Sequence, residues 1–395
     1  MKLSNRVINM QSSPIRRLIP YAEQAKSKGI KVLHLNIGQP DVPTPPAFFE
    51  AIEKYENEVV PYSHSAGLIE LRKAFSDYYK KWSLDIKPEE IIVTNGGSEA
   101  IIFALSTICD PGDQIMVIEP FYANYRSFAG MVNVGLNPIT TKPENGYAMP
   151  DIAEFKSKLN EKTKGIILSN PCNPTGAVYS REDMLDLLKF ARENDLYVIV
   201  DEVYREFVFD GLEAFSAMEF EDYHDILIMV DSVSKRYSSC GARVGLFATK
   251  NKEIFTQAMK MAQARLSPPT MAQIGSIGML ALDEEYMESI KAEYMKRRDI
   301  VYEELSKIEG LSFEKPHGAF YVSVKLPVES SEEFVKWMLT DFSVNGYTTM
   351  VAPLDGFYGT PGAGNSEIRI AYVLSEDKLR QSCEILRLGL EEYTK

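Results

Sequence analysis

Short runs of consecutive apolar residues alternate with amphipathic segments between about residues 90 and 250. The runs are rich in isoleucine and valine, and they occupy residues 90–94, 114–120, 165–170, 196–202, 225–231 and 243–249. Consecutive apolar positions are typical of strands that are covered on both faces. Helical patterns such as SEAIIFALSTI and REDMLDLLKFARENDL lie between several of the runs. The alternation predicts an α/β fold with a mainly parallel sheet sandwiched by helices.

The pattern changes after about residue 285, where a long charged helical segment leads to the apolar run GAFYVSVKL, a second helix and the strand-like EIRIAYVL. This order is typical of a smaller α+β unit. We therefore expect a large domain over 46–285 and a small C-terminal domain over 286–395. Residues 1–45 are expected to join the small domain or to cross the mouth of the site as an N-terminal arm.

Polar residues collect where the predicted strands end. The runs are followed in turn by GGS, FY, NPCNPTG, DEVY and DSVSK. Ligands of open α/β sheets bind at the carboxyl ends of the strands. The sequence therefore predicts a binding site at this one edge of the sheet.

Composition and charge limit the kinds of partner. The formal net charge of −13 argues against nucleic acid and anionic membrane surfaces, but not against a small anionic ligand. The four cysteines are far apart, which favours free thiols in a reducing compartment, and the four histidines are too scattered to indicate a metal site. No apolar run has the length of a signal peptide or a membrane span, so we expect a cytoplasmic protein.

Lys235 lies in DSVSKRYSSCGARVG, directly after a predicted strand. A lysine held there, partly desolvated, is suited to react with a carbonyl group. Groups that bind phosphate surround it in the sequence or at neighbouring strand ends. They are the glycine turn before a helix, two hydroxyls and a guanidinium: Gly97, Ser98, Ser232, Ser234 and Arg243.

A second set of residues matches a heteroaromatic ring. Asp201 ends a buried strand, and a carboxylate there needs a cationic partner such as a protonated ring nitrogen. Tyr204 and Asn173 supply hydrogen-bond donors for a ring oxygen, and Tyr122 supplies a face for stacking. Phosphate, ring nitrogen, ring oxygen and a reactive amine together describe pyridoxal 5'-phosphate.

The motifs YSHSAG, NGGSEA, NPCNPTG, DEVY, SVSK with Arg243, GAF and IRI occur in this order across nearly the whole chain. In this respect the sequence resembles the fold-type I pyridoxal-phosphate aminotransferases of class I, the aspartate aminotransferase superfamily. The resemblance implies a large domain built on a mainly parallel seven-stranded sheet, and a homodimer with shared active sites.

The resemblance also implies roles for individual residues. Lys235 would carry the cofactor as a Schiff base and then move the proton between the substrate Cα and the cofactor. Arg369 would clamp the substrate α-carboxylate, with Asn173 and the Gly38 backbone beside it. Tyr62 would reach the phosphate of the other subunit, and the phosphate- and ring-binding residues named above would keep those tasks.

The substrate is less well determined. Tyr122 replaces a tryptophan of the best-known aspartate enzymes, Ser239 replaces an apolar residue, and Ser98 stands where some bacterial aspartate enzymes carry a lysine. Arg265 lies where the family's second subunit contributes an arginine for the distal carboxylate. On this basis, and on the phrases SPIRRL, LNIGQPD and RIAYVL, we expect aspartate as donor and 2-oxoglutarate as acceptor. Arg16 and Arg17 in SPIRRL are either surface charges or part of an arm that closes the site.

Other functions stay open or are disfavoured. An aromatic amino acid donor is the alternative within the same reaction, and C–S β-lyase or cyclisation chemistry is the alternative on the same cofactor. A regulator built on this fold would need a DNA-binding domain before LNIGQPD, for which we expect no room. No G-x-G-x-x-G follows an N-terminal strand, which argues against a dehydrogenase, and GTPGAGNS lacks the lysine of a P-loop.

Overall fold

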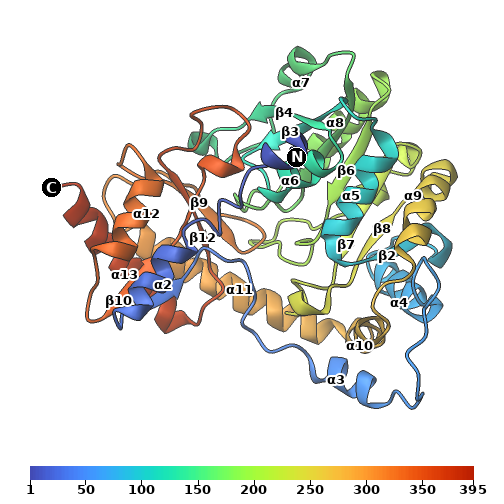
Figure 1. Cartoon of the computed structure of the whole chain (residues 1–395), viewed down its shortest axis with the longest axis horizontal. Helices are drawn as coiled ribbons and strands as arrows, with labels where there is room; N and C mark the ends of the chain where they lie inside the picture. The colour runs from blue at the N-terminus through green and yellow to red at the C-terminus, as the bar shows by residue number, and fades with distance from the viewer.

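A seven-stranded sheet forms the centre of the larger part of the molecule (Figure 1). The computed structural model describes all residues, 1–395. Along the sheet the strands are β2 (Ile91–Thr94), β8 (Gly245–Ala248), β7 (Leu227–Ser232), β6 (Tyr197–Asp201), β5 (Thr163–Ser169), β3 (Gln114–Glu119) and β4 (Gly135–Thr140). All neighbours are parallel except β8, which is antiparallel to both β2 and β7. The predicted fold class is confirmed.

One strand of this sheet escaped the sequence pattern. The edge strand β4 has the sequence GLNPIT, and only Ile139 within it is buried. Proline cannot donate to a ladder and is tolerated in edge strands, where one side of the backbone has no neighbour. An exposed, proline-containing edge strand lacks the apolar run by which the other six were recognised.

Alternate residues of the strands face two separate helical layers. Leu227 and Met229 of β7 belong to one buried cluster, with residues of α4 (Ile69–Lys80), α8 (Arg181–Glu193) and α10 (Thr270–Leu280). Ile228 and Val230 belong to the other, with residues of α5 (Gly96–Ile108), α6 (Asn124–Met131) and α9 (Lys252–Arg265). Burial on both faces explains the consecutive apolar positions of these strands.

The smaller part contains two further sheets. An antiparallel sheet has the order β11 (Ala352–Pro353), β12 (Glu367–Ala371) and β9 (Tyr321–Lys325), and β1 (Lys31–His34) pairs in parallel with β10 (Tyr347–Met350). The surrounding helices are α2 (Ile19–Ser27), α11 (Glu284–Leu305), α12 (Ser331–Thr340) and α13 (Glu376–Tyr393). The N-terminal β1 and α2 therefore pack with C-terminal elements (Figure 1).

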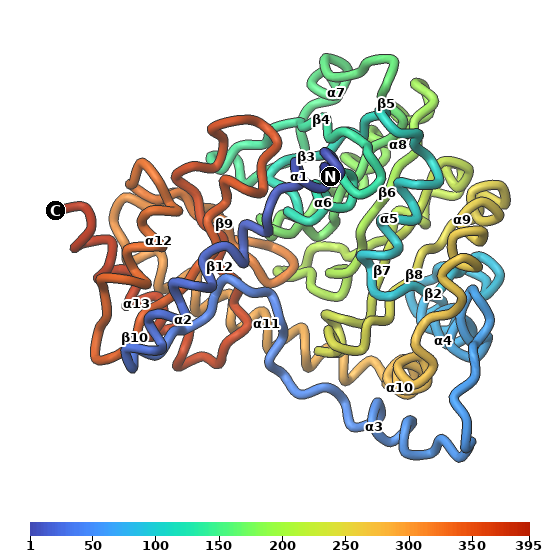
Figure 2. Tube along the Cα trace, viewed as in Figure 1, coloured from blue at the N-terminus to red at the C-terminus, as the bar shows by residue number.

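The N-terminal segment connects both parts. Helix α1 (Asn5–Ile8) lies against α6 on the large sheet, and the chain then crosses to α2 in the smaller part (Figure 2). After β1 it returns along α3 (Pro46–Glu53), which packs on α10 (Figure 2). The remaining helix, α7 (Ile152–Lys158), precedes β5. No helix combines the length and the apolar character needed to cross a membrane.

Candidate active site

A cavity of about 500 Å³ lies at the carboxyl edge of the large sheet and is closed on one side by residues of the smaller part. Because β8 runs antiparallel, the start of this strand and the preceding Arg243 lie at the same edge as the ends of β6 and β7. Twelve of the site residues expected from the sequence line this cavity: Gly38, Gly97, Ser98, Tyr122, Asn173, Asp201, Tyr204, Ser232, Ser234, Lys235, Arg243 and Arg369.

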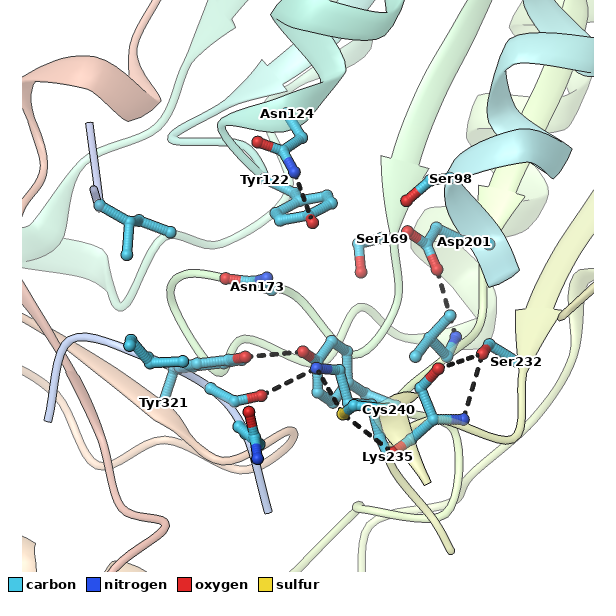
Figure 3. A pocket seen from close by; sticks show the side chains of 18 of the residues that line it. Ser98, Tyr122, Asn124, Ser169, Asn173, Asp201, Ser232, Lys235, Cys240 and Tyr321 are labelled. Carbon is cyan, nitrogen blue, oxygen red and sulfur yellow. Dashed lines mark hydrogen bonds between the residues drawn. The ribbon is translucent and has the colours of Figure 1, made fainter. Parts of the chain in front are cut away.

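The amine of Lys235 points into the cavity, as Figure 3 shows. Its Nζ donates a hydrogen bond to the carbonyl oxygen of Gly38 at 2.8 Å and lies 3.7 Å from the Sγ of Cys240. Burial lowers the pKa of Lys235, but Tyr321, Cys240 and Tyr122 more than offset this, so the pKa lies above its ordinary value. The free amine is therefore charged at neutral pH and must lose a proton before it can act as a nucleophile.

Asp201 ends β6 as a buried carboxylate without a salt bridge. Its Oδ2 accepts a hydrogen bond of 2.8 Å from Tyr125, and its Oδ1 accepts a weaker one of 3.3 Å from the Val203 backbone. Burial raises the pKa of Asp201 to about 6. A carboxylate in this state gains from any cation brought next to it, because the ion pair offsets the cost of desolvation.

Donors for an anion gather around the first turn of α5. The hydroxyls of Ser232 and Ser234 lie 2.6 Å apart at the end of β7. Arg243 forms no salt bridge, and its guanidinium donates only to the carbonyl oxygens of Cys240 at 3.1 Å and Asn95 at 3.2 Å. Free N–H groups of a helix N-terminus, hydroxyls and a guanidinium together form a site suited to phosphate.

A glycine is required beside this guanidinium. Gly96 has φ +72°, a conformation that other residues rarely adopt. A Cβ at this position would lie 2.3 Å from the Nη2 of Arg243. Substitution of Gly96 would therefore both strain the turn and displace the guanidinium from the α5 terminus.

Arg369 on β12 is a second cation without a carboxylate partner, and its side chain is almost fully buried at 1% exposure. It donates to Oδ1 of Asn173 at 2.9 Å and to the carbonyl oxygen of Asn36 at 2.7 Å, while its Nε has no partner. Its guanidinium also lies over the ring of Tyr321, 4.4 Å from the centroid. A buried guanidinium held only by neutral groups is prepared to bind a carboxylate.

Tyr321 is a site residue that the sequence analysis missed, although it directly follows the motif GAF. Its hydroxyl lies 2.7 Å from that of Tyr204. A Cβ on Gly38 would come within 1.8 Å of the same hydroxyl, so only glycine fits there. Ser169, Asn124 and Cys240 also line the cavity and were not expected (Figure 3).

Two expected residues lie outside the cavity of their own chain. Tyr62 is 80% exposed, in a segment that precedes α4. Arg265 ends α9, and its guanidinium donates to Glu99 at 2.7 Å, to the carbonyl oxygen of Ser65 at 2.8 Å and to that of Val93 at 3.3 Å. Arg265 is therefore occupied by groups of its own chain, and these contacts give no support to the substrate-binding role expected from the sequence.

Comparison with known proteins agrees with this geometry. The family model for aminotransferases of class I and II matches residues 30–386. The chain belongs to this family. It is 31% identical to a probable aspartate/prephenate aminotransferase of Aquifex aeolicus over 99% of both chains. It is also 31% identical to an aspartate aminotransferase of Sulfurisphaera tokodaii, over 92% of this chain and 90% of the other.

Solved structures give the same result. The aspartate aminotransferase of Thermus thermophilus with maleate superposes with a TM-score of 0.88 and 28% identity, over 98% of this chain and all of the other. The protein is thus an aminotransferase that acts on amino acids and 2-oxo acids with pyridoxal 5'-phosphate. The site fits this cofactor, because unpaired Asp201 suits its ring nitrogen and unpaired Arg243 at the α5 terminus suits its phosphate.

Proposed function

We propose that this aminotransferase moves the amino group of L-aspartate to 2-oxoglutarate. The assignment of the reaction rests on one observation: Lys235, Asp201, Arg243 and Arg369 converge on a single cavity. The assignment of the donor is supported by the similarity over nearly the full length to relatives named aspartate aminotransferases. The absence of disulfides among the four cysteines is in keeping with a cytoplasmic enzyme.

The cofactor, when bound, supplies an electron sink that makes the substrate Cα–H bond acidic. Lys235 is the proposed base, because its Nζ extends from the strand end into the cavity where it can accept the proton from Cα. Arg369 binds the α-carboxylate and so fixes the amino acid with its Cα–H bond toward this amine. The lysine has to release its own proton first, since its pKa is raised in this pocket.

The remaining residues hold and orient the ring. Asp201 would keep a proton on the ring nitrogen, because its buried carboxylate would be stabilised by the resulting ion pair. Tyr204 and Asn173 would donate hydrogen bonds to the ring oxygen, and Tyr122 would stack on the ring face. The phosphate would be held by Gly97, Ser98, Ser232, Ser234 and Arg243.

We further propose a homodimer in which Tyr62 contributes to the phosphate site of the other subunit. The segment around Tyr62 exposes Val59 at 70% and Val60 at 57%, and Leu266 nearby is 52% exposed. The hydroxyl of Thr270, which follows Leu266 in the chain, donates a hydrogen bond to the carbonyl oxygen of Pro61 and so connects this region to the Tyr62 segment. Exposed apolar residues in one area are typical of an interface, and a second copy would cover them.

We also propose the domain division expected from the sequence, with a large domain over 46–285, a small domain over 286–395 and residues 1–45 joined to the small one. The separate sheets and the pairing of β1 with β10 support this division.

The donor is tested by single-turnover spectra of the cofactor-loaded enzyme, with aspartate, glutamate, tyrosine, alanine and cystathionine offered separately. Rapid conversion of the cofactor to its amino form by aspartate and glutamate is the expected result. Conversion by tyrosine alone would assign the enzyme to the aromatic branch. Release of pyruvate from cystathionine, with no amino form of the cofactor, would overturn the aminotransferase reaction itself.

A further inference from the structure

The lining of the cavity contains one more cationic side chain than the proposed reaction requires. Four cationic residues line it, Lys235, Arg243, Arg369 and Arg16, against one carboxylate, that of Asp201. In the proposed function Lys235 would carry the cofactor, Arg243 would hold its phosphate, and Arg369 would bind the α-carboxylate of the substrate. Asp201 is matched by the ring nitrogen. Arg16 is the one cation of the lining that has no anion assigned to it.

The backbone around Arg16 is firmly placed on the smaller part. Leu18 is 2% exposed and belongs to the core there. Pro14 is buried, and it packs so closely on Gly356 that a Cβ at Gly356 would lie 2.3 Å from it. Arg16 itself sits in a turn, where its N–H donates to the Ser13 carbonyl oxygen at 3.0 Å. The side chain therefore extends from a fixed point at the mouth of the cavity.

The neighbouring Arg17 differs from Arg16 in its ion pairs and in its place relative to the cavity. Arg17 is held by Asp355 at 2.6 Å and by Glu332 at 2.8 Å, so it anchors the arm to the smaller part. Arg16 forms no salt bridge and no side-chain hydrogen bond, and it lines the cavity whereas Arg17 does not. Of the two candidates in SPIRRL, only Arg16 is free to meet a ligand.

We propose that Arg16 binds the acidic group at the far end of the substrate side chain and so selects dicarboxylic donors. This inference rests on the proposed dicarboxylate aminotransferase function and deepens it. Both guanidinium groups line the same cavity, with Arg369 buried and Arg16 exposed. We expect an amino acid with two carboxylates to place one at each guanidinium. Guanidinium groups bind carboxylates with two parallel hydrogen bonds, which fixes orientation as well as charge.

The residue comes from the chain's own N-terminal arm rather than from a second subunit. Arg265, which the sequence suggested for this task, is held by Glu99 and by two backbone carbonyl groups of its own chain. Ser98 carries no charge. The proposal therefore predicts that donor selectivity follows changes at Arg16, and that Arg265 has no part in it.

The experiment compares kcat/KM for aspartate and for alanine in the cofactor-loaded enzyme and its Arg16→Gln variant. We expect the ratio of aspartate to alanine to fall about tenfold to a hundredfold, the usual effect of losing a charge-assisted hydrogen bond. Arg16→Lys should restore part of the ratio, since it keeps the charge but not the bidentate geometry. Because Arg16 is exposed, the difference should also shrink at high salt.

Arg17→Gln is the matched control. It removes an identical charge one residue away, while the packing of Pro14 and Leu18 still holds the backbone of the arm, so it should leave the ratio of the two donors within about twofold. An aspartate-to-alanine ratio that is the same in wild type and Arg16→Gln would overturn the role of Arg16 while the aminotransferase function stands. Failure of the wild-type enzyme to use any dicarboxylic donor would instead overturn the proposed donor, and the role of Arg16 with it.

Discussion

The floor and the mouth of the cavity are built in opposite ways. At the floor, Asp201, Ser232 and Arg369 are all less than 10% exposed, and each is held by hydrogen bonds within the chain. At the mouth, Arg16 is exposed and makes no polar side-chain contact, although its backbone is anchored. The floor thus presents polar groups held in place by the chain, whereas the mouth presents one exposed, unpaired charge.

This difference separates chemistry from selectivity. Preorganised groups at the floor stabilise charge without the cost of ordering, which suits steps common to every amino acid. An exposed cation at the mouth is suited to distinguish side chains, which differ in charge and length from donor to donor. Changes at the floor should therefore abolish the reaction for all donors, and changes at the mouth should alter the preference among them.

The largest effect is expected for Lys235→Ala at the floor. Loss of the base should lower turnover of every donor by at least about a thousandfold. The near-visible absorption of covalently bound cofactor should also disappear, although Arg243 and the α5 terminus still bind phosphate. Borohydride reduction of the imine to a stable amine, followed by gel filtration in denaturant, measures the covalent link. A cofactor still attached to the variant would contradict the assignment.

Asp201→Asn should make the cofactor-free protein increasingly more stable than wild type as pH rises. The pKa of Asp201 is about 6 in the folded chain, whereas an aspartate without burial has a pKa of 3.8. Folding therefore favours the protonated form. The stabilising effect of that proton is complete below about pH 3.8 and is lost as pH rises through 6. Urea unfolding should show the variant gaining about 3 kcal/mol over wild type between pH 3 and pH 7.

Adding the cofactor provides the control for this comparison. Its ring nitrogen gives Asp201 a cationic partner, so the advantage of the asparagine variant should vanish in the loaded protein. A stability difference that does not change with pH would show that Asp201 is not the unpaired carboxylate described here.

Arg369→Lys should weaken binding of all donors by a similar factor. Lysine keeps the charge but loses the two parallel hydrogen bonds to the α-carboxylate, so kcat/KM should fall about tenfold to a hundredfold. Steady-state kinetics with aspartate and alanine should give equal losses for the two. A loss confined to aspartate would mean that Arg369 and Arg16 have exchanged roles.

The smallest effect is expected for Arg265→Ala, because Arg265 does not line the cavity of its own chain. Its salt bridge with Glu99 is only partly buried, so thermal or urea unfolding should show a loss of about 1 kcal/mol. The preference for aspartate over alanine should stay as in wild type. A large fall in that preference would restore the role that the sequence suggested for Arg265.

The sequence could place Asp201 and Ser232 at the floor because each ends a strand of the large sheet. Asp201 and Ser232 end strands whose apolar runs are unmistakable, and the register of parallel strands brings such ends together. The edge strand β4 and the direction of β8 were not predictable in the same way, since an apolar run reports burial and not orientation.

The role of the arginines at the mouth could not be predicted from the sequence, because it depends on which of them forms an ion pair in the fold. Arg16 and Arg17 are adjacent and chemically identical, and only the fold shows that Asp355 and Glu332 hold one and leave the other free. Arg265 likewise pairs with Glu99, which lies on a different helix. Long-range ion pairs of this kind leave no periodic signal in a sequence.

The most direct test of the central claim is to trap the cofactor on the enzyme with borohydride and to locate the modified residue by peptide mass spectrometry. The account predicts that a single lysine, Lys235 in the peptide that follows β7, carries the added mass. A cofactor attached to another lysine, or no attachment at all, would contradict the assignment of this cavity as the active site.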